Sequence, residues 1–136
     1  MNNVGYSGTP LAKKLGIKQG CRLSVINAPD HYFDLLTELP EVVMVADAKQ
    51  KKDLVHYFAT YFKQLQRDLS AMRRSIEQNG AVWISWSKKA SKVETDITED
   101  LIRKAAIENG LVDVKVCAVD QTWSGLKLVI PLKDRK

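Results

Sequence analysis

Residues 81–86 read Ala-Val-Trp-Ile-Ser-Trp and follow Asn79-Gly80, which in turn follows a segment with helical periodicity. Over about 61–78, apolar residues recur every three or four positions, which predicts a helix with one buried stripe. Thr60 is expected to cap this helix, and Asn79-Gly80 predicts its left-handed end. The aromatic and β-branched residues of 81–86 predict a strand. A helix, a glycine and a strand in this order are typical of the repeating unit of an α/β fold.

The same order of elements recurs downstream. Asp96 or Thr98 is expected to cap a second helix, with Glu99 completing a capping box. Asn109-Gly110 ends that helix, and residues 111–119 then predict a strand near a sheet edge. The residues expected on its buried face are Val112, Val114, Val116 and Ala118.

The upstream half supplies the remaining elements. Thr9-Pro10 and Gly16 bracket a short helix, because proline suits the first helical position and glycine the residue after the last. Residues 22–26 predict a strand, and Asp30 is expected to cap a helix over about 31–37. Two more apolar runs of strand length follow at 42–46 and 54–59.

These elements predict one Rossmann-like α/β domain, a three-layer sandwich spanning residues 1–136. After a turn over 120–125, residues 126–130 return as an antiparallel strand, so we expect about six mainly parallel strands with a C-terminal antiparallel hairpin. Residues 1–8 form an N-terminal extension and residues 132–136 a basic tail.

Composition excludes several classes of protein. Two cysteines and two isolated histidines give no metal-ligand spacing and no disulfide framework, so we predict no metal site. No apolar run is long enough to span a membrane and no signal peptide is evident, so we expect a cytoplasmic protein. The net charge is +5, but most of the lysines and arginines are interleaved with acids. This pattern does not favour nucleic-acid binding.

Polar residues follow the ends of several predicted strands. Ligands of open parallel sheets bind outside the carboxyl ends of the strands, where the strand order reverses. The segments on that edge are 27–30, 60–61, 87–91 and 120–125. The candidate ligand-binding residues are Asn27, Asp30, Thr60, Ser87, Lys88, Lys89, Asp120, Trp123 and Ser124.

Each of these candidates also has a structural interpretation. Lys88 and Lys89 beside hydroxyls could hold a phosphate or carboxylate, or they could simply solubilise a loop. Trp123 could close over a ligand or fold back on the body, the second being favoured. Asp30 and Asp120 could act as general bases, yet neither has a recognisable catalytic spacing and no catalytic residue is predicted. Ser7-Gly8-Thr9 is a weaker anion site.

One segment departs from nucleotide-binding proteins of this layout. Asn27-Ala28-Pro29-Asp30 follows the first long strand, where a glycine-rich phosphate loop is expected. Pro29 also lacks a backbone donor. The sequence therefore predicts no cofactor.

Two resemblances add to this interpretation. The order of segments resembles a small class I methyltransferase-like Rossmann domain, carried by Leu15-Gly16-Ile17-Lys18-Gln19-Gly20, by residues 76–85 and by the terminal hairpin. Nearly the whole chain also resembles an uncharacterised bacterial domain family, which implies a bacterial cytoplasmic protein and supplies no catalytic residue. The strings that carry this second resemblance are Tyr6-Ser7-Gly8-Thr9-Pro10-Leu11, Lys14-Leu15-Gly16-Ile17, Asn27-Ala28-Pro29, Lys88-Lys89-Ala90-Ser91, Thr98-Glu99-Asp100, Val116-Cys117-Ala118-Val119-Asp120 and Trp123-Ser124-Gly125-Leu126-Lys127.

The sequence thus favours a non-catalytic binding or regulatory module that takes a small anionic ligand or a protein partner at the strand-end edge. The alternative is a divergent S-adenosylmethionine-dependent methyltransferase-like enzyme, supported by analogy of fold. Nucleic-acid binding rests on the net charge alone.

Overall fold

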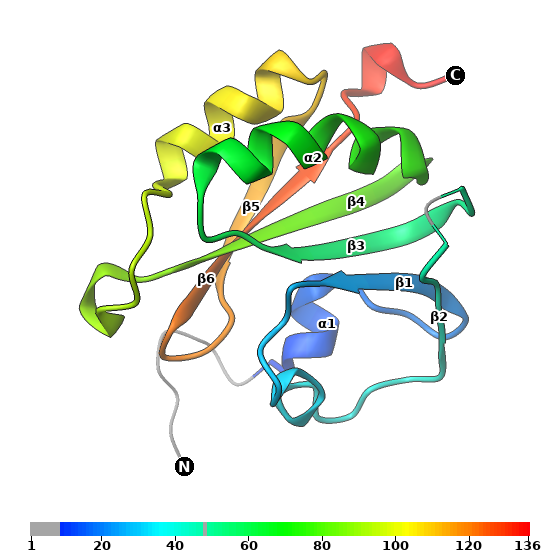
Figure 1. Cartoon of the computed structure of the whole chain (residues 1–136). Coiled ribbons are helices and arrows are strands. Elements are labelled where there is room, and N and C mark those ends of the chain that lie inside the picture. The colour runs from blue at the N-terminus through cyan, green and yellow to red at the C-terminus, as the bar shows by residue number, and fades with distance from the viewer. Residues whose placement is uncertain (1–8, 48) are drawn as a thin grey trace.

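The computed structural model describes residues 9–47 and 49–136, which build a six-stranded sheet with helices on both faces (Figure 1). The strand order is β2-β1-β3-β4-β6-β5, in which the first four strands are parallel and β6 runs antiparallel to both β4 and β5. The predicted mainly parallel Rossmann-like sheet with its C-terminal hairpin is confirmed. The strands are β1 (Cys21–Ile26), β2 (Val42–Met44), β3 (Lys52–Phe58), β4 (Ile76–Ser87), β5 (Val112–Ala118) and β6 (Trp123–Val129).

Two helices cover one face and shorter elements cover the other. Helices α2 (Phe62–Ser75) and α3 (Glu99–Glu108) lie above the sheet in Figure 1, and helix α1 (Leu11–Leu15) lies below it. The short 3-10 helix Tyr32–Leu35 packs into the same core as α1. Each face has its own apolar core, and Trp83 ties α1 to the sheet by donating from its indole nitrogen to the Leu15 carbonyl oxygen at 2.9 Å.

Helix α2 follows the predicted periodicity but ends earlier than predicted. Leu65, Leu69 and Met72 form its buried stripe. The helix ends at Ser75, and Asn79-Gly80 lies inside β4 instead of ending the helix. A Cβ on Gly80 would lie 3.0 Å from the Asp53 carbonyl oxygen. This glycine therefore serves the close approach of β3 and β4, not a helix end.

The helix caps also differ from the expected ones. Thr60 does not cap α2; the Asp96 carboxylate accepts the Phe62 N–H at 2.7 Å instead. Thr98 caps α3 by accepting from the Leu101 N–H at 3.2 Å. The predicted capping box of Asp96 and Glu99 is wrong, because Asp96 serves the neighbouring helix.

Two further expected elements change. The helix predicted over 31–37 is only the turn Tyr32–Leu35, and it has no side-chain cap from Asp30. The turn predicted over 120–125 is shorter, because β6 already begins at Trp123.

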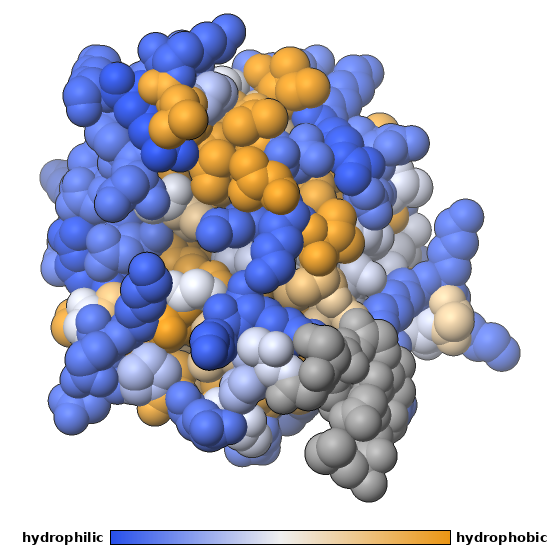
Figure 2. All heavy atoms as spheres, turned by 180° about the vertical axis from the view of Figure 1, so that it is seen from behind, coloured by the Kyte–Doolittle hydropathy of each residue, from blue (hydrophilic) through white to orange (hydrophobic). Residues whose placement is uncertain are grey.

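Strand β5 does not bury one continuous face. Its pairing with β6 shifts between Asp113 and Lys115, which places Val114 in a bulge. Asp113 accepts from Arg103 of α3, whereas Lys115 reaches the Lys14 carbonyl oxygen of α1. The expected alternation fails, and Val114 is 55% exposed. Figure 2 views the molecule from this side and shows a band of apolar surface across it.

None of the helices among the described residues is long and apolar enough to cross a bilayer.

Candidate functional site

The predicted strand-end residues follow strands that end at one edge of the sheet, and they make several separate sets of contacts there. Asn27 directly follows β1 and has a left-handed backbone conformation, with φ of 59°. Asn27 and Asp30 are both exposed. The Thr60 carbonyl oxygen accepts from the Thr95 hydroxyl and from the Asp96 N–H, so Thr60 anchors the segment before α3. These contacts give Thr60 a structural role.

Lys88, Asp120 and Trp123 do come together. The Lys88 ammonium donates to the Asp120 carbonyl oxygen at 2.8 Å. The Asp120 carboxylate accepts the N–H groups of Thr122 and Trp123, and its other oxygen lies 3.4 Å from His31 Nε2. These contacts order the turn that follows β5.

The Trp123 ring takes the second of its two predicted positions. It folds back on the body and packs edge-on against Phe58, with ring centroids 5.1 Å apart. Its neighbour Ser124 pairs with Trp86 in the β4–β6 ladder.

Lys88 and Lys89 have different surroundings. Lys89 lines a cavity of about 720 Å³ at the start of α3, together with Trp86, Ser87 and Arg103. The Ser87 hydroxyl is buried and has no hydrogen-bond partner among the described residues. Lys88 is not among the residues that line this cavity, and its ammonium donates to the Asp120 carbonyl oxygen.

Ser7 and Gly8, two of the three residues of the weaker anion-site prediction, lie outside the described residues.

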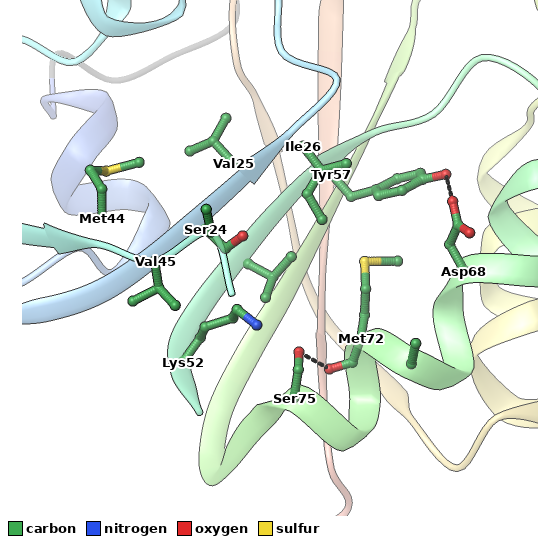
Figure 3. A pocket seen from close by; sticks show the side chains of 13 residues that line it. Ser24, Val25, Ile26, Met44, Val45, Lys52, Tyr57, Asp68, Met72 and Ser75 are labelled. Carbon is green, nitrogen blue, oxygen red and sulfur yellow. Dashed lines mark hydrogen bonds between the residues drawn. The ribbon is translucent and has the colours of Figure 1, made fainter. Parts of the chain in front are cut away.

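A different cavity of about 480 Å³ lies on the α2 face of the sheet (Figure 3). Strands β2 and β3 are joined by residues 45–51, whose described part contains no helix. Parallel strands normally need a crossover of about a dozen residues or more, usually a helix that covers the sheet. Here the sheet beside α2 stays uncovered, which leaves the cavity. Its lining residues are Ser24, Val25, Ile26, Met44, Val45, Ala46, Lys52, Val55, Tyr57, Asp68, Ala71, Met72 and Ser75.

One end of this cavity carries a buried ammonium. Lys52 is only 4% exposed, and its Nζ donates to the Asp47 carbonyl oxygen at 2.9 Å. An ammonium has three donors, so this one can also bind an anionic group inside the cavity. The hydroxyls of Ser24 and Ser75 lie near it in Figure 3.

The other end carries a phenol and a carboxylate. The Tyr57 hydroxyl donates to an Asp68 carboxylate oxygen at 2.8 Å. Burial, and then the hydrogen bond to Asp68, raises the pKa of Tyr57. The phenol therefore keeps its proton, and Asp68 remains a hydrogen-bond acceptor. The Asp68 side chain is 33% exposed, and its other carboxylate oxygen accepts from Arg67 Nε at 3.3 Å.

None of the nine predicted ligand-binding residues lines this cavity. The sequence contained one usable signal: the interval between the apolar runs 42–46 and 54–59 is too short for a crossover helix. That interval predicts an uncovered area of sheet. Which side chains face it depends on strand register, which the sequence does not reveal.

The fold is that of the class I methyltransferase-like Rossmann proteins. No protein-family model and no curated protein matches the chain. Among solved structures, a protein from Sulfolobus solfataricus described as a type 11 methyltransferase matches with a TM-score of 0.67 at 14% identity, covering 98% of this chain and 96% of that one.

Two further structures show the same likeness. An S-adenosylmethionine-dependent methyltransferase from Aquifex aeolicus matches with a TM-score of 0.61 at 13% identity, over 88% of this chain and 87% of that one. Magnesium protoporphyrin IX methyltransferase from Synechocystis PCC 6803 with bound S-adenosylmethionine matches with a TM-score of 0.57 at 12% identity, over 88% and 74%.

These likenesses correct the main functional prediction from the sequence. The sequence favours a non-catalytic binding or regulatory module because polar segments gather at the strand-end edge and a catalytic constellation is absent. The neighbours are S-adenosylmethionine-dependent methyltransferases, which favours the alternative interpretation. The Synechocystis enzyme holds S-adenosylmethionine in one structure and S-adenosylhomocysteine in another, so neighbours of this fold bind a small ligand.

Proposed function

We propose that this chain is an S-adenosylmethionine-dependent methyltransferase and that it binds the cofactor in the cavity between β1 and α2. The observation that carries the proposal is the cavity itself. Its volume of about 480 Å³ suits a small cofactor. It reaches Ile26 at the end of β1, which lies between β2 and β3, so that the chain passes to one side of β1 for β2 and to the other side for β3. In doubly wound sheets, such a reversal of strand order marks the ligand crevice.

The segment after β1 departs from class I methyltransferases, for which the resemblance implies glycines at this place. A glycine-rich loop cradles phosphate, and S-adenosylmethionine carries none. The cofactor itself needs no phosphate cradle, so we infer that side chains of the cavity hold it in place of a glycine loop at Asn27-Ala28-Pro29.

The lining residues fit the chemical groups of the cofactor. Apolar side chains at the end of β1 and just after β2, among them Ile26 and Val45, would offer contact surface for the adenosine. Lys52 would hold the carboxylate, because its ammonium is buried and has donors to spare. Asp68 and the Tyr57 ring would face the positively charged groups.

The bound cofactor would supply a methyl group on a sulfonium, which is transferred to a nucleophile of the acceptor. The residues of the chain would orient the cofactor and keep water away from it. The Asp68 carboxylate would help to orient the cofactor, since its negative charge favours the bound cation.

Isothermal titration calorimetry with S-adenosylmethionine and S-adenosylhomocysteine tests the proposal. Wild-type protein should bind both. Asp68→Asn should weaken binding of S-adenosylmethionine by about tenfold, the value of one charge-assisted hydrogen bond. Ala71→Phe should weaken it further, because Ala71 lies on the exposed rim of the cavity.

Asp100→Asn is the matched control, since the Asp100 side chain is 96% exposed and does not line this cavity. Circular dichroism establishes that each variant is folded. If the folded wild type releases no heat with either compound at millimolar concentration, the proposal is wrong.

A further inference from the structure

Lysines from three elements converge on the α1 face of the sheet. Lys115 of β5 and Lys127 of β6 are direct cross-strand partners. Residues in such positions have Cβ atoms about 5 Å apart, and like charges there are destabilising. The Lys115 ammonium donates to the Lys14 carbonyl oxygen at 3.3 Å, which holds it beneath α1. Lys18, just after α1, lines a pocket together with Lys127.

The electrostatics of Lys127 show how close these charges are. Burial lowers the pKa of Lys127, and the charges of Lys115 and Lys18 lower it further. Each of the three causes disfavours an ammonium at this position. The surroundings of Lys127 are therefore unfavourable for its positive charge.

No acid neutralises this group among the residues that the structure describes. Lys18, Lys115 and Lys127 make no ion pair within 4.0 Å of a described carboxylate. Asp53 lines the same pocket, but Arg22 holds both of its carboxylate oxygens, with Nη2 3.1 Å from Oδ1 and the backbone nitrogen 2.9 Å from Oδ2. The positive charge of the three lysines is left without a partner.

The pocket beside these lysines has the shape and donors for a compact anion. Its volume is about 360 Å³, and it lies at the amino-terminal end of the parallel strands, away from the proposed cofactor cavity. Gln19 and Asn79 supply side-chain amides to its lining, and Gly16, Gly20 and Gly80 leave backbone uncovered there. Amide and ammonium donors around a small volume are typical of oxyanion binding.

We propose that Lys18, Lys115 and Lys127 form a binding site for a compact, phosphate-bearing small molecule. A small molecule is favoured over a nucleic acid because Lys18 and Lys127 line a pocket, with Lys115 beside Lys127, and no aromatic side chain lines that pocket for base stacking. This site is independent of the proposed methyltransferase function and lies on the opposite face of the sheet.

Tripolyphosphate is the probe, and thermal unfolding of the full chain is the measurement. Without the anion at low salt, Lys127→Met should raise the melting temperature, because it removes a cation that its surroundings oppose. With tripolyphosphate, the wild type should gain stability and Lys127→Met should gain much less. By titration, the variant should bind tripolyphosphate about tenfold more weakly.

Lys104→Met is the matched control, because Lys104 is exposed on α3 and should respond like the wild type. Sodium chloride at equal ionic strength separates binding from screening. Equal stabilisation of the wild type and Lys127→Met by tripolyphosphate would overturn the site. So would binding of a single-stranded RNA oligonucleotide that depends on Lys127 while tripolyphosphate has no effect. Binding of S-adenosylmethionine should be unchanged in Lys127→Met, so the two proposals can fail separately.

Discussion

At the scale of single residues, His56 shows how a polar side chain is accommodated in the core. It is fully buried in β3, between the Tyr32 hydroxyl at 2.9 Å from Nδ1 and the Ser85 hydroxyl at 2.7 Å from Nε2. Its ring also stacks on Phe58. Both ring nitrogens have partners, which identifies His56 as a structural residue, as its isolated position in an apolar run predicts.

Burial makes His56 a source of pH-dependent stability. Burial lowers the pKa of the His56 imidazole from 6.5 to about 3. Because the unfolded chain takes up this proton near pH 6.5 and the folded chain only near pH 3, acid favours unfolding. The free energy of unfolding should fall as the pH drops below 6.5, by up to about 1.4 kcal/mol per pH unit.

Urea unfolding of the wild type and of His56→Gln over this pH range checks the prediction. Glutamine does not titrate, so the variant should be less stable at neutral pH but should lose less stability on acidification. The difference between the two curves cancels the contribution of the carboxylates. Parallel curves would show that His56 is not the group responsible.

At the scale of elements, Asp96 links α2 to the segment before α3. Its carboxylate accepts the Phe62 N–H, one of the donors that the start of α2 leaves unsatisfied. Asp96→Ala should therefore destabilise the protein by about 1 kcal/mol. Hydrogen exchange should accelerate at the amide of Phe62 and leave the first turn of α3 protected, because Thr98 caps that helix.

Asp100→Ala is the comparison for Asp96→Ala, since both remove an acid next to α3 and only Asp96 bonds to α2. If Asp96→Ala accelerates exchange only in the first turn of α3, the result would support the capping box that the sequence predicts.

The elements also show what sequence patterns can and cannot predict. Period and turn residues predict α1, α2, α3 and the strands, because those signals are local. The helix end predicted at Gly80 is wrong because, in sequence, a glycine needed for the close approach of two strands cannot be told from one that ends a helix. The bulge at Val114 is invisible for a related reason: it arises from pairing with β6, not from β5 alone.

At the scale of the whole molecule, the candidate sites arise from register and from a missing helix. The strand-end candidates follow strands that end at one edge, and there the Lys88 ammonium donates to the Asp120 carbonyl oxygen. The cavity beside α2 exists because residues 45–51 connect β2 to β3 without a helix in their described part. Lys115 and Lys127 are twelve positions apart in sequence and face each other only through the hairpin.

The most direct test of the central claim is an NMR titration of the isotopically labelled chain with S-adenosylhomocysteine. If the cofactor binds beside α2, the amide signals that shift should be those of the cavity, foremost Ile26, Ala46, Tyr57 and Asp68. The signals of α3 and of the lysine pocket should stay in place. Shifts confined to the cavity at the start of α3, or no saturable shift at all, would contradict the assignment of this cavity to the methyl donor.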